Sequence, residues 1–183
     1  MAFLFELISK KLLLEENQSV LDIGCGWGGM AAHIYKKSNA NVVGVTLSEE
    51  QIAYAKQRKI REKLEKVEYR LQDYRNVNEK YDRIVSVGMF EHVGTAHYQE
   101  FFNKVYDLLN DSGVALIHTI GRLNEPGNTD PWIDKYIFPG GYIPALSETV
   151  SRVEKSGLSL TDVQVLRFHY AETLKRWRYN FYD

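Results

Sequence analysis

Apolar side chains recur along the chain at two different spacings, and the spacing changes where turn residues occur. Residues 48–64 and 96–110 carry apolar side chains at every third or fourth position, which is the spacing of one helix face. Between such segments lie short apolar runs, among them "SVLDIG" and "NVVGVTL", that are typical of buried strands. The pattern predicts helices at residues 3–14, 29–35, 48–64, 96–110, 148–154 and 171–182, and strands at residues 19–24, 41–47, 67–74, 81–88, 114–121 and 158–168.

Strands that alternate with helices predict an α/β fold, with a mostly parallel sheet and helices on both faces. We expect one domain over residues 1–183, because no linker or low-complexity tract interrupts the pattern. All four prolines fall within residues 122–144, so a long ordered loop or lid is expected at about residues 121–145. Ligands of such sheets bind beyond the carboxyl ends of the strands. The residues that this rule brings to one edge are Gly24 to Gly28, Thr46, Asp73, Glu91 and His118.

Composition narrows the classes of function without choosing one. The 183 residues are 44% hydrophobic and 26% charged, as in soluble globular proteins, and the net charge is −1. A chain so nearly neutral has no overall field that would attract nucleic acid or an anionic membrane, so we expect no nucleic-acid partner. Cys25 is the only cysteine, which excludes an internal disulfide and suits a reducing, cytosolic compartment. The histidines lack metal-ligand spacing, so no metal site is expected.

The stretch "IVSVGMFEHVG" places Glu91 and His92 directly after an apolar strand. A buried carboxylate is costly unless a partner uses it, so Glu91 is a candidate for chemistry at the sheet edge. A structural role as a helix N-cap is the alternative for Glu91. His118, inside "LIHTI", could likewise be an ordinary core histidine.

The glycine-rich turn allows two functional interpretations. Gly24, Gly26 and Gly29 satisfy G-x-G-x-x-G after a strand, the fingerprint of a dinucleotide-binding turn. A nicotinamide site also needs an acidic residue at the end of the second strand, where this chain has Thr46. With Asp22 at the preceding strand end, "LDIGCGWGG" instead resembles the first motif of class I S-adenosylmethionine-dependent methyltransferases. A glycine turn that merely closes against a helix remains the structural explanation.

Further motifs make the resemblance specific. "VLDIGCGWGG", "VVGVTLSEEQ", "LQDYR", "YDRIVSVGMFEHVG", "HTIG", "DPWIDKYIFPGGYIPAL" and "HYAETLKRW" follow one another as in cyclopropane-fatty-acid synthases, a group that includes the mycolic acid cyclopropane synthases. The resemblance implies a Rossmann-like class I methyltransferase fold with S-adenosylmethionine as cofactor. It also implies transfer of a methylene unit to the double bond of an unsaturated phospholipid acyl chain. The implied cofactor residues are Asp22, Gly24, Cys25, Gly26, Trp27 and Gly28 at the methionine end, Thr46, Leu47 and Gln51 at the ribose and adenine, and Asp73, Tyr74 and Val87 on the adenine side.

The resemblance also implies a bound bicarbonate that acts as base, held by Glu91, His118, Tyr170 and the backbone of Ile120. Such a base suits the reaction, because an alkene that attacks a sulfonium methyl leaves a cation that must lose a proton. Residues 136–144 and the opening "MAFLF" are candidates for contact with lipid. We therefore expect a cytoplasmic protein, peripheral to the inner face of the membrane.

The chain departs from the family at both ends. On the resemblance we expect a chain truncated at both ends, without the covering segment that family members carry before the nucleotide core and without a final antiparallel edge strand. We predict weak cofactor binding, little turnover and self-association, to a homodimer for example, through an exposed sheet edge. Three alternatives stay open: an N-methyltransferase of a small amine, a domain that binds cofactor or lipid without catalysis, and, more distantly, a nicotinamide-dependent oxidoreductase.

Overall fold

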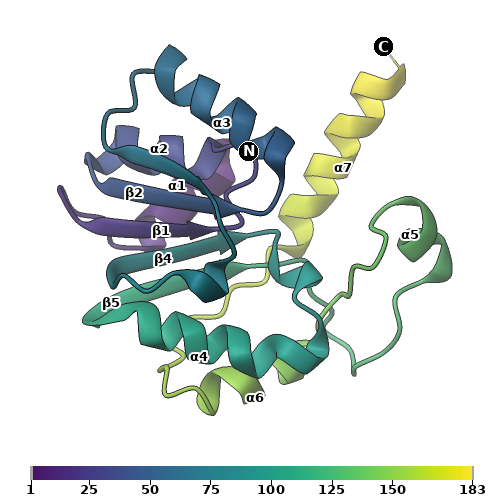
Figure 1. Cartoon of the computed structure of the whole chain (residues 1–183). Helices are drawn as coiled ribbons and strands as arrows, with labels where there is room; N and C mark the ends of the chain where they lie inside the picture. The colour runs from purple at the N-terminus through teal and green to yellow at the C-terminus, as the bar shows by residue number, and fades with distance from the viewer. Residues whose placement is uncertain (1, 183) are drawn as a thin grey trace.

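The computed structural model describes residues 2–182, and five parallel strands form its sheet in the order β3-β2-β1-β4-β5 (Figure 1). The predicted parallel sheet is confirmed. The strands are β1 (Ser19–Ile23), β2 (Asn41–Thr46), β3 (Val67–Leu71), β4 (Tyr81–Val87) and β5 (Leu109–His118). The helices are α1 (Ala2–Lys11), α2 (Gly29–Ser38), α3 (Glu49–Arg61), α4 (Tyr98–Leu108), α5 (Pro131–Tyr136), α6 (Leu146–Glu154) and α7 (Arg167–Tyr182), with short 3-10 turns η1 (Tyr74–Asn76), η2 (Phe90–His92) and η3 (Thr95–His97).

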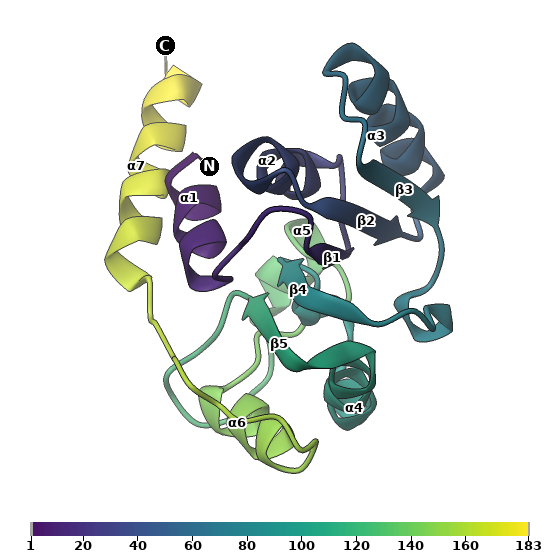
Figure 2. The ribbon, with the colours of Figure 1, turned by 90° about the vertical axis from the view of Figure 1, so that its left-hand side faces the viewer.

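Helices cover both faces of the sheet, and each face has its own core (Figure 2). Successive side chains of a strand point to opposite faces, so Val20 of β1 belongs to one core and Leu21 to the other. The first core is closed by α1, α2 and α3. The second is closed mainly by α4, whose Phe101 lies with its ring centroid 5.2 Å from that of Phe90.

The central strand β1 decides where the site lies. It pairs with β2 on one side and with β4 on the other, so the strand order reverses at β1. The loops that leave β1 and β4 therefore diverge at the carboxyl ends and open a crevice between them. The Ser86 hydroxyl of β4 donates to the carbonyl of Ile23 over 3.0 Å and ties these two strand ends together.

Three strand predictions need correction. The strand expected at residues 67–74 ends at Leu71, because Asp73 caps the 3-10 turn η1 that begins at Tyr74. Residues 158–168 were expected to form a strand, but residues 158–166 have no regular structure and α7 begins at Arg167. The apolar residues are present, yet no strand among residues 2–182 pairs with this segment, and Leu160, Val163 and Val165 are about half exposed. β5 begins at Leu109 rather than at Val114.

The predicted lid is a loop whose two ends are held together. The backbone N–H of Arg122 donates to the carbonyl of Pro144 over 2.9 Å, and the N–H of Leu146 donates back to Arg122. Between these ends lies the short helix α5, which begins where Asp130 accepts a hydrogen bond from the N–H of Trp132 over 2.9 Å. The lid is therefore anchored at its root, beside the carboxyl ends of β4 and β5 (Figure 1).

Candidate active site

The glycine turn connects β1 to α2 and has an open, left-handed backbone. Gly24, Gly26 and Gly28 all have positive φ angles, of 76°, 53° and 76°. No heavy atom lies within 4 Å of the place where a Cβ on Gly26 would be, so a ligand can approach the backbone there. Among residues 2–182 we find no acceptor for the backbone N–H groups of Gly26 and Trp27, which leaves both free to bind an anionic group.

Asp22 lies beneath this turn at the end of β1 and is almost completely buried. Burial raises the pKa of its carboxyl to about 7, and a hydrogen bond from the backbone of Ala31 opposes the rise. Its Oδ2 has no hydrogen-bond partner within the described structure. Cys25, also buried, packs behind the turn against Gly44, where it fills space.

The tip of β2 presents a small polar pair. The Thr46 hydroxyl donates to Oε1 of Gln51 over 2.8 Å, and the Ser48 hydroxyl accepts from the Gln51 backbone N–H. Ser48 is therefore the N-cap of α3, but the Gln51 side chain binds Thr46 instead of closing a capping box. Leu47, between them in sequence, is 70% exposed. Thr46, Leu47 and Gln51 thus share one strand tip.

The three residues predicted for the adenine side of the cofactor differ in the contacts that they already make. The Asp73 carboxylate holds the Arg75 guanidinium through several contacts and also caps η1, so its oxygens already have partners. The Tyr74 ring meets Phe101 edge-on, with centroids 5.5 Å apart, and so also packs against the core. Val87 ends β4 and pairs in register with His118 of β5. Of these residues, Asp73 would have to share its carboxylate with a ligand.

Glu91, His118 and Ile120 come together where β4 and β5 end. The Ile120 backbone N–H donates to Glu91 Oε1 over 2.7 Å, so this carboxylate is oriented from across the sheet edge. Burial lowers the pKa of His118, and the nearby charge of Glu91 opposes that decrease. Glu91 Oε2 and His118 Nδ1 are both buried without a partner in the described part of the chain. Buried polar atoms are normally hydrogen-bonded, so each of these two atoms is a candidate to bind a small polar ligand.

Tyr170, the fourth residue predicted for this group, lies on α7. Its ring is half exposed and contacts Trp177, with centroids 6.4 Å apart, and its backbone N–H donates to Leu166. α7 runs beside α1, where His169 stacks on Phe3 at 5.0 Å between ring centroids (Figure 2). The structure thus brings Glu91, His118 and Ile120 together, whereas the Tyr170 ring contacts Trp177 of its own helix.

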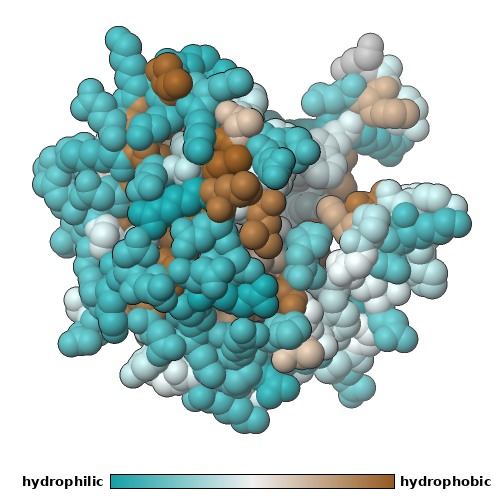
Figure 3. Space-filling model, in the orientation of Figure 1, coloured by the Kyte–Doolittle hydropathy of each residue, from teal (hydrophilic) through white to brown (hydrophobic). Residues whose placement is uncertain are grey.

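Hydrophobic side chains gather on the side of the molecule that faces α5 and α7, where the surface is hollowed (Figure 3). The segment predicted to be a lid has exposed apolar side chains of its own, Trp132, Tyr136, Ile137 and Phe138. Among residues 2–182, no helix is both long enough and apolar enough to cross a bilayer. No group of three or more potential metal-ligating side chains is found in the same residues.

Comparison with known proteins gives this site its context. The sequence profile described as mycolic acid cyclopropane synthetase matches residues 4–183. The chain belongs to this family. The predicted resemblance is confirmed, and so is the Rossmann-like class I methyltransferase fold.

Individual members of the family extend beyond this chain. The cyclopropane-fatty-acyl-phospholipid synthase of Escherichia coli (strain K12) is 43% identical over 176 residues, which cover 96% of this chain and 45% of that protein. This chain therefore spans about half the length of that curated relative.

Two solved structures show how far the likeness of fold extends. The mycolic acid cyclopropane synthase CmaA1, complexed with SAH and CTAB, superposes with a TM-score of 0.87 at 35% identity and covers 96% of this chain and 67% of its own. Coclaurine N-methyltransferase, bound to N-methylheliamine and SAH, has a TM-score of 0.71 at 30% identity and covers 81% of this chain and 47% of its own. This chain is thus a methyltransferase-type domain of the cyclopropane synthase family.

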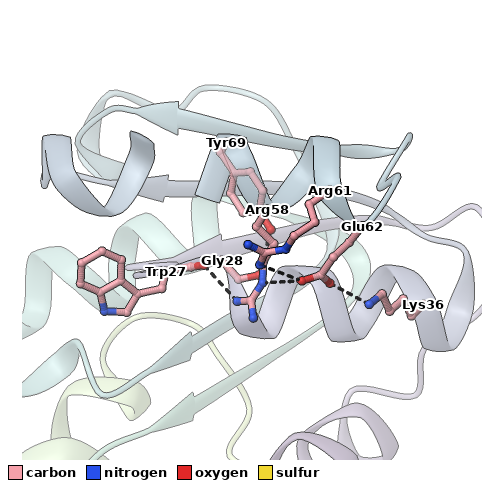
Figure 4. A network of polar contacts seen from close by, with 7 residues as sticks. All are labelled: Trp27, Gly28, Lys36, Arg58, Arg61, Glu62 and Tyr69. Carbon is pink, nitrogen blue, oxygen red and sulfur yellow. Dashed lines mark hydrogen bonds and ion pairs between the residues drawn. The ribbon is translucent and has the colours of Figure 1, made fainter. Parts of the chain in front are cut away.

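Two residues that sequence reasoning missed hold the glycine turn from outside. Tyr69 of β3 and Arg58 of α3 donate hydrogen bonds to the carbonyls of Gly28 and Trp27 (Figure 4). Neither belongs to a recognised motif, and only their position in space identifies them.

Proposed function

We propose that the protein uses S-adenosylmethionine to transfer a one-carbon unit to the double bond of an unsaturated phospholipid acyl chain, which closes a cyclopropane ring. The observation that carries the proposal is the buried Glu91, oriented by the Ile120 N–H and next to His118, at the strand ends beside the glycine turn. Membership of the cyclopropane synthetase family supports it.

The glycine turn and the tip of β2 would hold the cofactor, which supplies an electrophilic sulfonium methyl group when bound. The free N–H groups of Gly26 and Trp27 suit a carboxylate, and the buried, unpartnered Oδ2 of Asp22 suits a positively charged group. CmaA1 was solved with SAH, which supports an S-adenosyl ligand in this family. We assign Asp22, Gly24, Cys25, Gly26, Trp27 and Gly28 to its methionine end, and Thr46, Leu47, Gln51, Asp73, Tyr74 and Val87 to its ribose and adenine.

Glu91 and His118 would hold a bicarbonate ion, which supplies the base for this reaction. Glu91 Oε2 can accept a hydrogen bond from a hydroxyl. His118 Nδ1, when it carries the proton, can donate a hydrogen bond to an oxygen. The N–H of Ile120 already donates to Glu91, so we assign it the orientation of that carboxylate. A direct contact from Tyr170 would require its side chain to point toward Glu91, and this part of the assignment stays a prediction.

The lid and its surroundings would exclude water and receive the acyl chain. Water must be kept from a carbocation, and the apolar side chains beside α5 and α7 provide such a surface. CTAB, found with CmaA1, is a surfactant with a long alkyl tail, which agrees with a lipid-like substrate. Because that substrate lies in a bilayer, the protein would work as a peripheral protein at the inner, cytoplasmic face of the membrane.

The test is product analysis by mass spectrometry after long incubation of the chain with S-adenosylmethionine and vesicles of unsaturated phospholipid. Turnover is expected to be slow, and the product should gain the mass of one CH₂ group without remaining unsaturated. Glu91→Gln keeps the size of the side chain and should abolish the product while SAH still binds. Glu100→Gln, at an exposed carboxylate, is the matched control and should leave product formation unchanged. Undiminished product from a folded Glu91→Gln variant would falsify the assignment.

Transfer to the nitrogen of a small amine is the second candidate, favoured by the likeness to coclaurine N-methyltransferase. Such a reaction needs no bicarbonate. Methylation of small amines that persists in Glu91→Gln and in bicarbonate-free buffer, with no change in lipid mass, would favour it over ring formation.

A further inference from the structure

The carbonyl side of the glycine turn is held by two neighbouring elements. The buried Tyr69 hydroxyl, on β3, donates to the carbonyl of Gly28 over 2.8 Å. Arg58 Nη1, on α3, donates to the carbonyl of Trp27 over 3.1 Å. These are consecutive residues of the turn, so two successive peptide groups are fixed by side chains of β3 and α3 (Figure 4).

Arg58 is itself held in place by an ion-pair network. Its Nε donates to Glu62 Oε1 over 2.9 Å, and Lys36 of α2 donates to Glu62 Oε2 over 2.7 Å. The hydrogen bond from Lys36, with a further one from Arg58, lowers the pKa of Glu62 to about 2, so this carboxylate stays charged at neutral pH. The ion pairs of Glu62 therefore connect Lys36 of α2, the helix that follows the turn, to Arg58 of α3, which contacts the turn.

The indole of Trp27 contacts Tyr54, whose ring in turn lies beside Arg58. Its ring meets the Tyr54 ring edge-on, with centroids 5.5 Å apart, and the guanidinium of Arg58 lies 5.8 Å from the centroid of Tyr54. Arg58 therefore contacts both the carbonyl of Trp27 and the ring that supports its indole.

The turn needs such support because of its own composition. Three of its glycines have positive φ, and a glycine backbone has many competing conformations in the absence of contacts. Ligand affinity falls by the fraction of time that a binding-competent conformation is populated. Contacts that fix the carbonyls of Trp27 and Gly28 raise that fraction, because the peptide group with the Trp27 carbonyl is joined through the Trp27 Cα to the peptide group that carries the free Trp27 N–H.

We propose that Arg58 and Tyr69 are positioning residues that keep the glycine turn in the shape that binds the S-adenosyl cofactor. The proposal rests on the cofactor of the proposed function, and it assigns neither residue a contact with the ligand. Glu62 and Lys36 act one step further away, by holding Arg58.

The test compares SAH affinity with stability for two conservative variants and two matched controls. Arg58→Lys keeps the charge but loses the fork that reaches Trp27 and Glu62 together, and Tyr69→Phe removes only the hydroxyl. Arg70→Lys alters an arginine that pairs with Glu68 and Glu79 away from the turn, and Tyr81→Phe removes a buried hydroxyl that has no partner in the described structure. We expect Arg58→Lys and Tyr69→Phe each to raise the Kd for SAH about tenfold, and the controls to change it less than about twofold.

A second measurement reports on the turn without any ligand. In a Trp132→Phe, Trp177→Phe background, Trp27 is the only tryptophan, and both replaced side chains are exposed. Adding Arg58→Lys or Tyr69→Phe should lower the fluorescence anisotropy of Trp27, whereas Arg70→Lys and Tyr81→Phe should not.

The outcomes separate the two proposals. If the unmodified chain fails to bind SAH, the cofactor assignment is refuted, and Trp27 anisotropy still decides whether Arg58 and Tyr69 hold the turn. If SAH binds and the two variants match their controls in Kd and in anisotropy, the positioning role is overturned. A loss of affinity no larger than that of a control with equal loss of thermal stability would overturn it as well.

Discussion

The replacement of Asp22 by Asn tests how far ionisation of the buried carboxylate beneath the glycine turn lowers the free energy of unfolding. Burial raises the pKa of Asp22 from 3.8 to about 7, so the folded chain keeps a proton that the unfolded chain has already released. The stability that this proton contributes is therefore fully present below pH 3.8, the pKa in the unfolded chain. It is lost as pH rises through about 7, the pKa in the folded chain. A difference of about 3 pKa units corresponds to about 4 kcal/mol in total, of which about 2–3 kcal/mol falls between pH 5 and pH 8.

Asn has nearly the same shape as Asp and keeps an oxygen for the Ala31 N–H, but it cannot ionise. It also places an amide where Oδ2 already lacks a partner, so both proteins bury one unsatisfied polar atom there. Urea unfolding at pH 5 and pH 8 should show the original chain losing about 2–3 kcal/mol more than Asp22→Asn over that interval. Asp111→Asn, at an exposed position, controls for the loss of a carboxylate. Parallel pH profiles for the original chain and Asp22→Asn would refute the reasoning.

Three further predictions concern the turn, the core and the imidazole. Gly28→Ala should destabilise the fold by about 3 kcal/mol, because its Cβ would lie 2.7 Å from the Tyr69 hydroxyl at a positive φ. The Cβ of Gly26→Ala would meet nothing within 4 Å, so this variant should lose only about 1 kcal/mol of stability while binding SAH more weakly. Urea unfolding measures the stabilities and calorimetry the SAH binding, and equal losses of stability would contradict the contact argument. Phe90→Ala, at a completely buried ring, should cost about 3–5 kcal/mol by urea unfolding, and a loss below about 1 kcal/mol would show that the core can collapse around it. Burial lowers the pKa of His118 below 6.5, so the stability that the neutral imidazole contributes should be lost as pH falls below 6.5. Glu91→Gln removes a charge that raises this pKa and should lower the pKa further. A higher His118 pKa in the variant, measured by NMR titration of the imidazole, would contradict this.

The local pattern of the sequence predicted most of the fold. The spacing of apolar residues in residues 48–64 and 96–110 predicted α3 and α4, and the short apolar runs predicted β1, β2 and β4 close to their observed bounds. They also located β3 and β5, although β3 is shorter than predicted and β5 begins earlier. Residues 158–168 show where such a pattern is insufficient. Alternation predicts which face of a strand would be buried, but a strand also needs an edge to pair with, and the sequence of the segment carries no information on whether one is available.

The motifs likewise predicted which residues would lie at the carboxyl ends of the strands, and Glu91, His118 and Ile120 lie together there. The sequence did not predict that the Ile120 N–H is already engaged by Glu91. That contact joins residues 29 positions apart along the chain, and it depends on the register between β4 and β5.

The sequence by itself determined the order of the five sheet strands and of most helices, the glycine turn and the family, because each of these depends on local residue preferences or on short contiguous motifs. The tertiary structure alone decided which polar atoms are buried without partners, which strand lacks a neighbour, and that Arg58 and Tyr69 hold the turn. These properties depend on distances between segments that are remote in sequence, and such distances are set by the packing of helices against the sheet.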